Sequence, residues 1–150
     1  PNTPAIIGEG ATAIAGGKFA AAEHFEKARF IFSSVGIVVV IEEALMDAVT
    51  AISGSGPAYL FLLSEMMEEA GEKLGLGKEQ VRKLVRQTLS GSVRMLLESG
   101  FEPAALRERV TSPGGTTEAA LNCLREKRFR ETFIKAVHEA CRRSEELSSG

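Results

Sequence analysis

Two loops rich in Gly, Ser and Pro contain the residues of this sequence best suited to bind a small anion. The first covers residues 53–58, Ser-Gly-Ser-Gly-Pro-Ala, and the second covers residues 111–117, Thr-Ser-Pro-Gly-Gly-Thr-Thr. Each loop leads into a predicted helix, whose first N–H groups lack intrahelical partners and carry partial positive charge. Glycines also let the backbone approach a ligand, so both loops are candidate sites for a carboxylate or a phosphate. Either loop alone is equally typical of a tight turn followed by a helix cap.

Several other site chemistries do not fit the sequence. Neither loop is followed by the Lys-Ser/Thr pair of a nucleoside triphosphate loop, and neither has the dinucleotide-binding pattern of three glycines. The segment Gly8-Glu9-Gly10 has Ala13 where the third glycine is required. Two cysteines without CxxC spacing and two histidines predict no metal site. A net charge of −2 and a pI near 5.8 give no basic surface for nucleic acid.

Composition predicts a globular protein outside the membrane. Of the 150 residues, 44% are hydrophobic and 25% charged, and no apolar run approaches the ~20 residues of a membrane span. No secretory signal is visible, so we expect a cytoplasmic location with reduced thiols. The chain begins at Pro1 without a Met, which suggests a fragment or a processed chain.

Residues 1–42 differ in pattern from the rest of the chain. Residues 5–17 are small, apolar and punctuated by glycine, which predicts one or two strands, and residues 20–34 have a helical period. Residues 37–41 are Ile-Val-Val-Val-Ile, which is typical of a fully buried parallel strand. This strand, helix and strand form one α/β unit, which we interpret as the last part of a larger dinucleotide-binding domain.

The second predicted domain, residues 43–150, shows no strand pattern, so the fold class is mainly α. Its helices have apolar faces wider than one neighbour would cover, which favours burial against a partner subunit. Gly91 lies inside one of these helices, and a glycine at such a position often permits a close helix crossing. The helices are predicted at residues 43–52, 57–74, 78–99, 103–110, 117–127 and 130–147.

Four segments, in order along the whole chain, together resemble the pyrroline-5-carboxylate reductases. Pro-Asn-Thr-Pro-Ala at residues 1–5 resembles the family's Met-Pro-Asn-Thr-Pro segment, and residues 47–59 resemble its first helical-domain signature. Residues 110–117, Val-Thr-Ser-Pro-Gly-Gly-Thr-Thr, resemble the second signature. Ala136-Val137 with residues 143–147 resemble its closing helix. The resemblance implies a helical dimerisation bundle preceded by a short α/β segment from a Rossmann-type domain.

The resemblance also implies a reaction. The family reduces 1-pyrroline-5-carboxylate to L-proline with NADPH or NADH, the last step of proline biosynthesis, and forms homodimers that in some members assemble into larger rings. The substrate is expected between the two domains at the dimer interface. Because most of the cofactor domain is missing, the resemblance implies that this chain has little or no reductase activity by itself.

Carried over position by position, the resemblance implies a role for each loop. The second loop is expected to hold the substrate carboxylate, with Glu118 pointing outward, away from that anion. The first loop is expected to form the wall beside the substrate ring and the nicotinamide. The implied catalytic hydroxyls are Thr50 and Ser55; the substrate-binding residues are Ser112, Gly114, Gly115, Thr116 and Thr117; and the cofactor-binding residues are Asn2, Pro4, Ser53, Gly54, Gly56 and Pro57.

Two other readings remain open. A non-catalytic helical oligomerisation module would form a dimer without affinity for proline-like carboxylates. A related imine or hydroxy-acid reductase would share the dimer but prefer another substrate.

Overall fold

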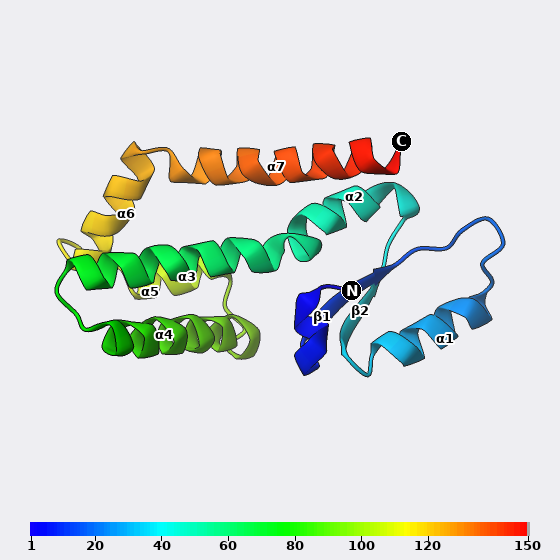
Figure 1. Cartoon of the computed structure of the whole chain (residues 1–150), viewed down its shortest axis with the longest axis horizontal. Coiled ribbons are helices and arrows are strands. Elements are labelled where there is room, and N and C mark those ends of the chain that lie inside the picture. Colours follow the sequence, from blue (N-terminus) through cyan, green and yellow to red (C-terminus); the bar gives the residue numbers. More distant parts are fainter. Residues whose placement is uncertain (150) are drawn as a thin grey trace. The chain divides into compact units, whose positions relative to one another are not determined.

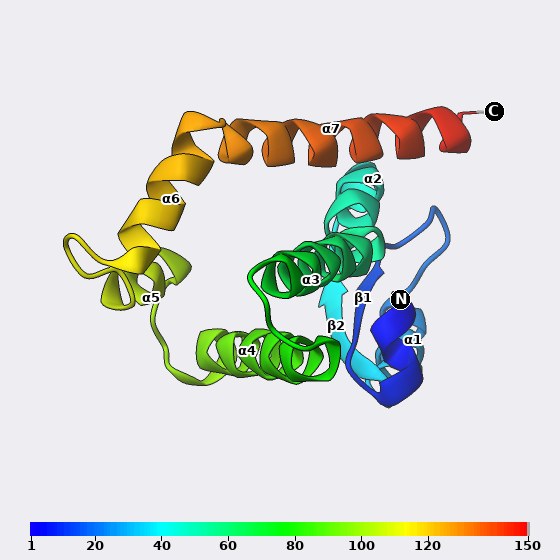
Figure 2. The ribbon, with the colours of Figure 1, turned by 60° about the vertical axis from the view of Figure 1, so that its left-hand side comes forward.

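A computed structural model describes residues 1–149 of the chain (Figures 1 and 2). It divides into two compact units, and each is described by itself. One contains residues 1–60 together with the C-terminal residues from Phe133, and the other is Phe61–Thr132.

The first unit begins with the predicted strand, helix and strand. A 3-10 helix, η1 (Thr3–Ile7), precedes β1 (Gly10–Ile14), which is followed by α1 (Ala22–Phe32) and β2 (Gly36–Val40). The two strands are parallel, with register from Gly10 opposite Gly36 to Ile14 opposite Val40. A parallel pair needs a crossover, which α1 supplies alongside the sheet (Figure 1). The prediction of a mainly α chain with a short α/β segment at its start is confirmed.

The expected burial of the second strand is wrong for this chain. Ile37 is 66% exposed and Val39 is 49% exposed, although both belong to the β-branched run that predicted a core strand. The described sheet has only two strands, and a parallel sheet is buried on both faces only when helices cover both. On β1, by contrast, Gly10 and Thr12 are buried, and Thr12 is 2% exposed.

The rest of this unit is helical. It contains a 3-10 turn, η2 (Glu43–Leu45), the one-turn helix α2 (Met46–Val49), the π-helical turn η3 (Thr50–Gly54), the start of α3 (Gly56–Lys73) and most of α7 (Phe129–Ser148). In this unit α7 packs against the chain around α2: the Ser144 hydroxyl donates to Asp47 Oδ1 at 2.6 Å. The ring of Tyr59 meets that of Phe133 edge-on, with centroids 5.5 Å apart.

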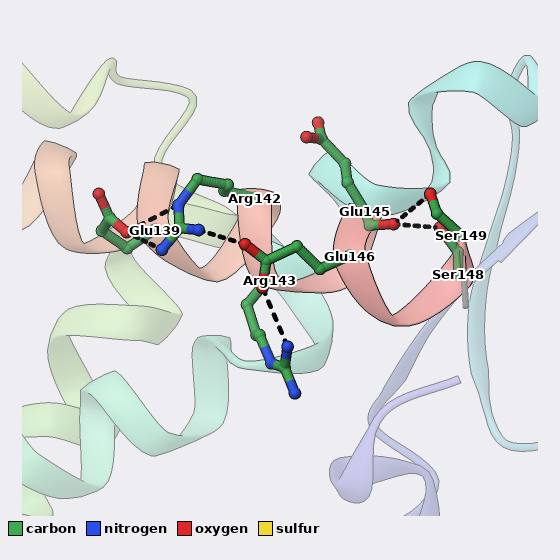
Figure 3. A network of polar contacts seen from close by, with 7 residues as sticks. All are labelled: Glu139, Arg142, Arg143, Glu145, Glu146, Ser148 and Ser149. Atoms are coloured by element: carbon green, nitrogen blue, oxygen red, sulfur yellow. Dashed lines mark hydrogen bonds and ion pairs between the residues drawn. The ribbon is translucent and has the colours of Figure 1, made fainter.

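An exposed network of charged side chains lies along α7 (Figure 3). Arg142 donates to Glu139 Oε2 from Nη2 at 2.7 Å and also pairs with Glu146, which accepts from Arg143 at 2.9 Å. The Arg142 guanidinium lowers the pKa of Glu139, and Glu139 raises the pKa of Arg142. All these pairs are three or four residues apart on one helix, so they support α7 itself, and each contributes little because solvent screens it.

The second unit is formed by the remainder of α3, α4 (Lys78–Glu98), α5 (Pro103–Arg109) and α6 (Thr116–Glu126). Its core lies where α3 meets α4: Gly71 on α3 is buried, as are Val81 and Val85 on α4. A Cβ on Gly71 would lie 2.0 Å from Val81 Cγ2, so the two helices touch here because α3 has no side chain at this point.

Little apolar surface is buried within the described chain. The only buried hydrophobic residues among residues 1–149 are Ala51, Val81 and Val85. In that part of the chain no helix is long and apolar enough to cross a membrane. Large apolar side chains instead remain exposed on several helices, among them Leu60, Phe61, Leu62, Leu84, Leu97 and Leu147.

Candidate functional site

The first predicted loop begins in the π-helical turn η3, which joins α2 to α3, and ends in the first turn of α3. The Ser55 N–H donates to the Thr50 carbonyl at 2.8 Å, which is the five-residue spacing of a π-helix. Single π turns inside helices occur frequently at functional sites. The sequence predicted a helix over residues 43–52 and a loop from Ser53, but the structure continues the helical path through Gly54.

The hydroxyls of this turn are not equivalent. Thr50 Oγ1 donates to the Met46 carbonyl at 3.0 Å, and Ser53 Oγ donates to the Val49 carbonyl at 3.1 Å. Both are local bonds of a side chain to the preceding helical turn, and both use the hydroxyl proton. The half-buried Ser55 hydroxyl makes no hydrogen bond with any of residues 1–149. Ser55 is therefore the hydroxyl of this turn whose proton remains available to a ligand.

Asn2 lies against this turn. Its Nδ2 donates to the Ser53 carbonyl at 2.9 Å, although the two residues are 51 positions apart in sequence. Its Oδ1 accepts the Ala11 N–H at 2.9 Å, and Pro4, half-buried, lies in the first turn of η1. The structure thus brings together two of the residues predicted at the cofactor, Asn2 and Ser53.

The glycines of the first loop, Gly54 and Gly56, are accessible from outside the chain. Gly54 is exposed, and Gly56 and Pro57 begin α3. A Cβ on Gly56 would meet no atom within 4 Å. Packing inside the chain therefore does not require glycine at position 56, and the backbone there is accessible to a group from outside.

The second predicted loop is a tight turn that ends at the first residue of α6. The Gly115 N–H donates to the Ser112 carbonyl at 3.0 Å, and Gly114 has φ of +72°, a conformation that favours glycine. Gly115 is the N-cap and provides no side-chain cap. The first N–H groups of α6, those of Thr116 and Thr117, therefore lack the usual side-chain acceptor at the N-cap and are suited to an anion.

One carboxylate already faces this turn. Glu118 Oε2 accepts the Gly114 N–H at 2.7 Å. The expectation that Glu118 points outward is wrong. As the third residue of α6 it reaches back, in the manner of the glutamate of a capping box, and it also lies favourably with respect to the helix dipole. The spacing Gly114-x-x-x-Glu118, at the start of a predicted helix, was the sequence pattern that could have indicated this contact.

The two loops belong to different compact units. Thr50 and residues 53–57 lie in the first unit with Asn2 and Pro4, whereas residues 112–117 lie in the second. Sequence reasoning missed Tyr59, whose hydroxyl donates to the Ala51 carbonyl at 3.0 Å and so supports the π turn from inside α3. Among residues 1–149, no cluster of three or more His, Cys, Asp or Glu could hold a metal ion.

Comparison with known proteins identifies a family whose matched region contains both loops. The family described as pyrroline-5-carboxylate reductase dimerisation matches residues 43–147. The chain belongs to the pyrroline-5-carboxylate reductase family. Reductases from Synechocystis and Pseudomonas aeruginosa are each 47% identical to it, over 98% and 99% of this chain respectively.

Solved structures of reductases agree with the fold. The reductase of Coxiella burnetii matches with a TM-score of 0.92 and 42% identity. The match covers 98% of this chain and 55% of the Coxiella chain. The Plasmodium falciparum enzyme, solved with NADP bound, has a TM-score of 0.91 and 40% identity over 96% of this chain, and 59% of that structure's chain is matched. The chain therefore spans little more than half the length of its reductase relatives; for the Synechocystis and Pseudomonas enzymes the share is 55%.

Proposed function

We propose that this chain is the substrate-binding and dimer-forming part of an enzyme that reduces 1-pyrroline-5-carboxylate to L-proline with NADPH or NADH. The observation that carries the proposal is the start of α6 in a chain of this family, where Gly115 gives no side-chain cap to the helix N–H groups. Residues 1–42 belong, in this proposal, to a dinucleotide-binding domain, and residues 43–150 form the helical domain.

The second loop holds the carboxylate of the substrate. The N–H groups of Thr116 and Thr117 lie at the positive end of the α6 dipole, and the Thr117 and Ser112 hydroxyls add two donors. Gly115, whose own N–H donates to the Ser112 carbonyl, lets the ligand approach because it has no side chain. These donors are uncharged, so they bind the carboxylate without a positively charged side chain. Such a site suits a reaction in which the orientation of the substrate ring matters more than the affinity for the substrate. Glu118, held on Gly114, stabilises the turn but repels the bound carboxylate.

The first loop lies beside the ring of the substrate. When bound, the nicotinamide cofactor supplies the hydride that reduces the carbon of the C=N bond. Ser55, whose hydroxyl is unpaired within residues 1–149, donates a hydrogen bond to the ring nitrogen and helps to deliver its proton. Thr50 Oγ1 donates to Met46, so it serves this site only as an acceptor, for example of the product amine N–H.

The residues of this chain fit only the nicotinamide end of the cofactor, where the hydride is transferred. Open space at Gly56 and the exposed backbone of Gly54 let a flat ring approach the turn. The dinucleotide-binding pattern of glycines is absent from these 150 residues, so the rest of the cofactor is bound by another part of the enzyme. The residues assigned to this end are Pro4, Ser53, Gly54, Gly56 and Pro57, and Asn2 supports them through its bond to the Ser53 carbonyl.

The exposed apolar helix faces are covered by a second copy of the chain. Leu60, Phe61 and Leu97 are 51%, 62% and 78% exposed, which is unfavourable for an isolated domain and typical of an obligate interface. A homodimer is therefore part of the proposal. The two free cysteines suit the predicted cytoplasmic location.

A binding titration tests the carboxylate site directly. Folded dimer of this chain, its oligomeric state checked by sedimentation, is titrated with L-proline while amide chemical shifts are followed by NMR. We expect saturable shifts at Gly114–Thr117 with L-proline and none with pyrrolidine, which lacks the carboxylate. Thr117→Ala is expected to weaken the binding without loss of folded structure.

A chimera tests the reaction. This chain replaces the matching C-terminal residues of the Pseudomonas aeruginosa reductase, and oxidation of NADPH by pyrroline-5-carboxylate is measured. Turnover that Thr117→Ala reduces supports the proposal. A folded, dimeric chimera without turnover and without L-proline binding would instead favour the oligomerisation module, and turnover of another imine only would favour the related reductase.

A further inference from the structure

The Ser53 carbonyl lacks both the α-helical and the π-helical donor in its own stretch of helix. In an α-helix the carbonyl of one residue accepts the N–H four residues later, and for Ser53 that residue is Pro57, which has no N–H. The π-helical alternative is the N–H of Ala58, which donates to the Ser55 carbonyl at 3.0 Å instead. The sequence Ser-Gly-Ser-Gly-Pro thus deprives the Ser53 carbonyl, in the first loop of the proposed site, of its regular helical donors.

Asn2 satisfies this acceptor. The 2.9 Å bond from its Nδ2 to Ser53 is matched by the 2.9 Å bond from the Ala11 N–H to its Oδ1. A flipped amide would set oxygen against the Ser53 carbonyl and NH2 against the Ala11 N–H, so the two partners together fix its orientation. Both ends of the side chain are therefore used in joining η1 and β1 to the turn.

This bond differs in origin from the other hydrogen bonds of the turn. The other hydrogen bonds of Thr50–Gly54 are local. Among them are the bonds of the Thr50 and Ser55 N–H groups and of the Thr50, Ser53 and Tyr59 hydroxyls, all within residues 46–59. Within residues 1–149, only the bond from Asn2 reaches the turn from elsewhere in the chain. It is a hydrogen bond that ties the turn to the α/β segment of the same unit.

We infer that Asn2 is a positioning residue, which holds the Thr50–Gly54 turn, and with it Ser55, through the Ser53 carbonyl that Pro57 leaves unpaired. Its side-chain amide acts on the turn and not on the cofactor. The consequence for turnover rests on the proposed function, whereas the hydrogen-bond relation among Asn2, Ser53 and Pro57 does not.

Asn2→Asp tests the relation with a nearly isosteric change. Aspartate keeps an oxygen to accept the Ala11 N–H but has no N–H for Ser53. Because a half-buried carbonyl then loses its partner, we expect the Ser55 amide proton to exchange with solvent about tenfold faster in the turn. Exchange at the buried Val85 amide in the other unit is the control and should not change.

Pro57→Ala provides the matched background. Alanine restores the N–H that can donate to Ser53, so Asn2→Asp should accelerate Ser55 exchange far less in Pro57→Ala than in the wild-type chain. Unchanged Ser55 exchange in Asn2→Asp would overturn the inference. Equal acceleration in both backgrounds would overturn it too, because Asn2 would then act independently of the missing proline donor.

The same variants in the chimera give the kinetic readout. A displaced turn should lower kcat per folded molecule about tenfold with a smaller change in KM for the imine, and Pro57→Ala should reduce that loss. A rise in KM for NADPH alone, with unchanged Ser55 exchange, would assign Asn2 to the cofactor and refute the positioning role. Absence of turnover in the wild-type chimera would refute the proposed function but leave the exchange experiment decisive for Asn2.

Discussion

The contact between α3 and α4 at Gly71 allows a prediction whose sign is set by two opposing effects. Replacing a helical glycine by alanine normally stabilises the folded state by about 0.8–1 kcal/mol. At Gly71 the new Cβ would lie 2.0 Å from Val81 Cγ2 and 3.2 Å from Val81 Cβ, far inside the ~3.5–4 Å of favourable carbon contacts. Overpacking of a buried contact costs about 1–3 kcal/mol. Since Gly71 and Val81 are both buried, we expect the upper end to apply, giving a net loss of about 2 kcal/mol for Gly71→Ala.

Urea unfolding followed by circular dichroism measures this change, with each variant at the same chain concentration. Gly91→Ala on α4 is the matched control, because a Cβ there meets nothing within 4 Å, and it should not destabilise the chain. In a Val81→Ala background the obstructing methyl group is gone, so Gly71→Ala should no longer cost stability. If Gly71→Ala and Gly91→Ala both had the free energy of unfolding of the wild-type chain, the close contact between the helices would be refuted.

Three further predictions concern single groups. The buried Thr12 hydroxyl has no hydrogen-bond partner among residues 1–149, and Thr12→Val replaces it by a methyl group of similar size. This change should raise the free energy of unfolding by about 1 kcal/mol in urea titrations, and a loss of stability would mean that the hydroxyl has a partner after all. Glu118→Gln keeps an acceptor for the Gly114 N–H but removes a charge, so L-proline should bind about fivefold more tightly, corresponding to about 1 kcal/mol, whereas an unchanged Kd would show that the charge does not reach the ligand. Burial, and secondarily the Glu145 carboxylate, raises the pKa of the Cys141 thiol, so its alkylation should reach half-maximal rate at a higher pH than that of a small free thiol, and Glu145→Gln should lower this midpoint only partly.

Much of the fold follows from local patterns in the sequence. The predicted helices match the observed ones to within one or two residues from α3 onward, because their apolar period and their Gly and Pro boundaries are local properties. The order strand, helix and strand over residues 1–42 follows from the β-branched run and the helical period between glycines. Burial of β2 could not be predicted in this way, because it depends on what covers the sheet and not on the residues of the strand.

The candidate site divides in the same manner. Residue types alone identified the two loops, since Gly, Ser and Pro before a helix have few other uses than turns and anion sites. They could not show that Thr50 and Ser53 donate their hydroxyl protons to the preceding helical turn while Ser55 does not. That difference depends on the π turn, in which the backbone hydrogen bond spans five residues where an α-helix spans four.

What the sequence determines by itself is the set of helices, the parallel strand pair and the resemblance to a reductase family, all of which depend on spacing along the chain. Tertiary structure alone decides which groups remain available. It assigns the Asn2 amide to the Ser53 carbonyl, 51 residues away, and the Ser144 hydroxyl to Asp47, 97 residues away. A hydrogen bond depends on the positions of two groups in space to within a few tenths of an ångström, and positions that precise arise only when separate segments of the chain pack together.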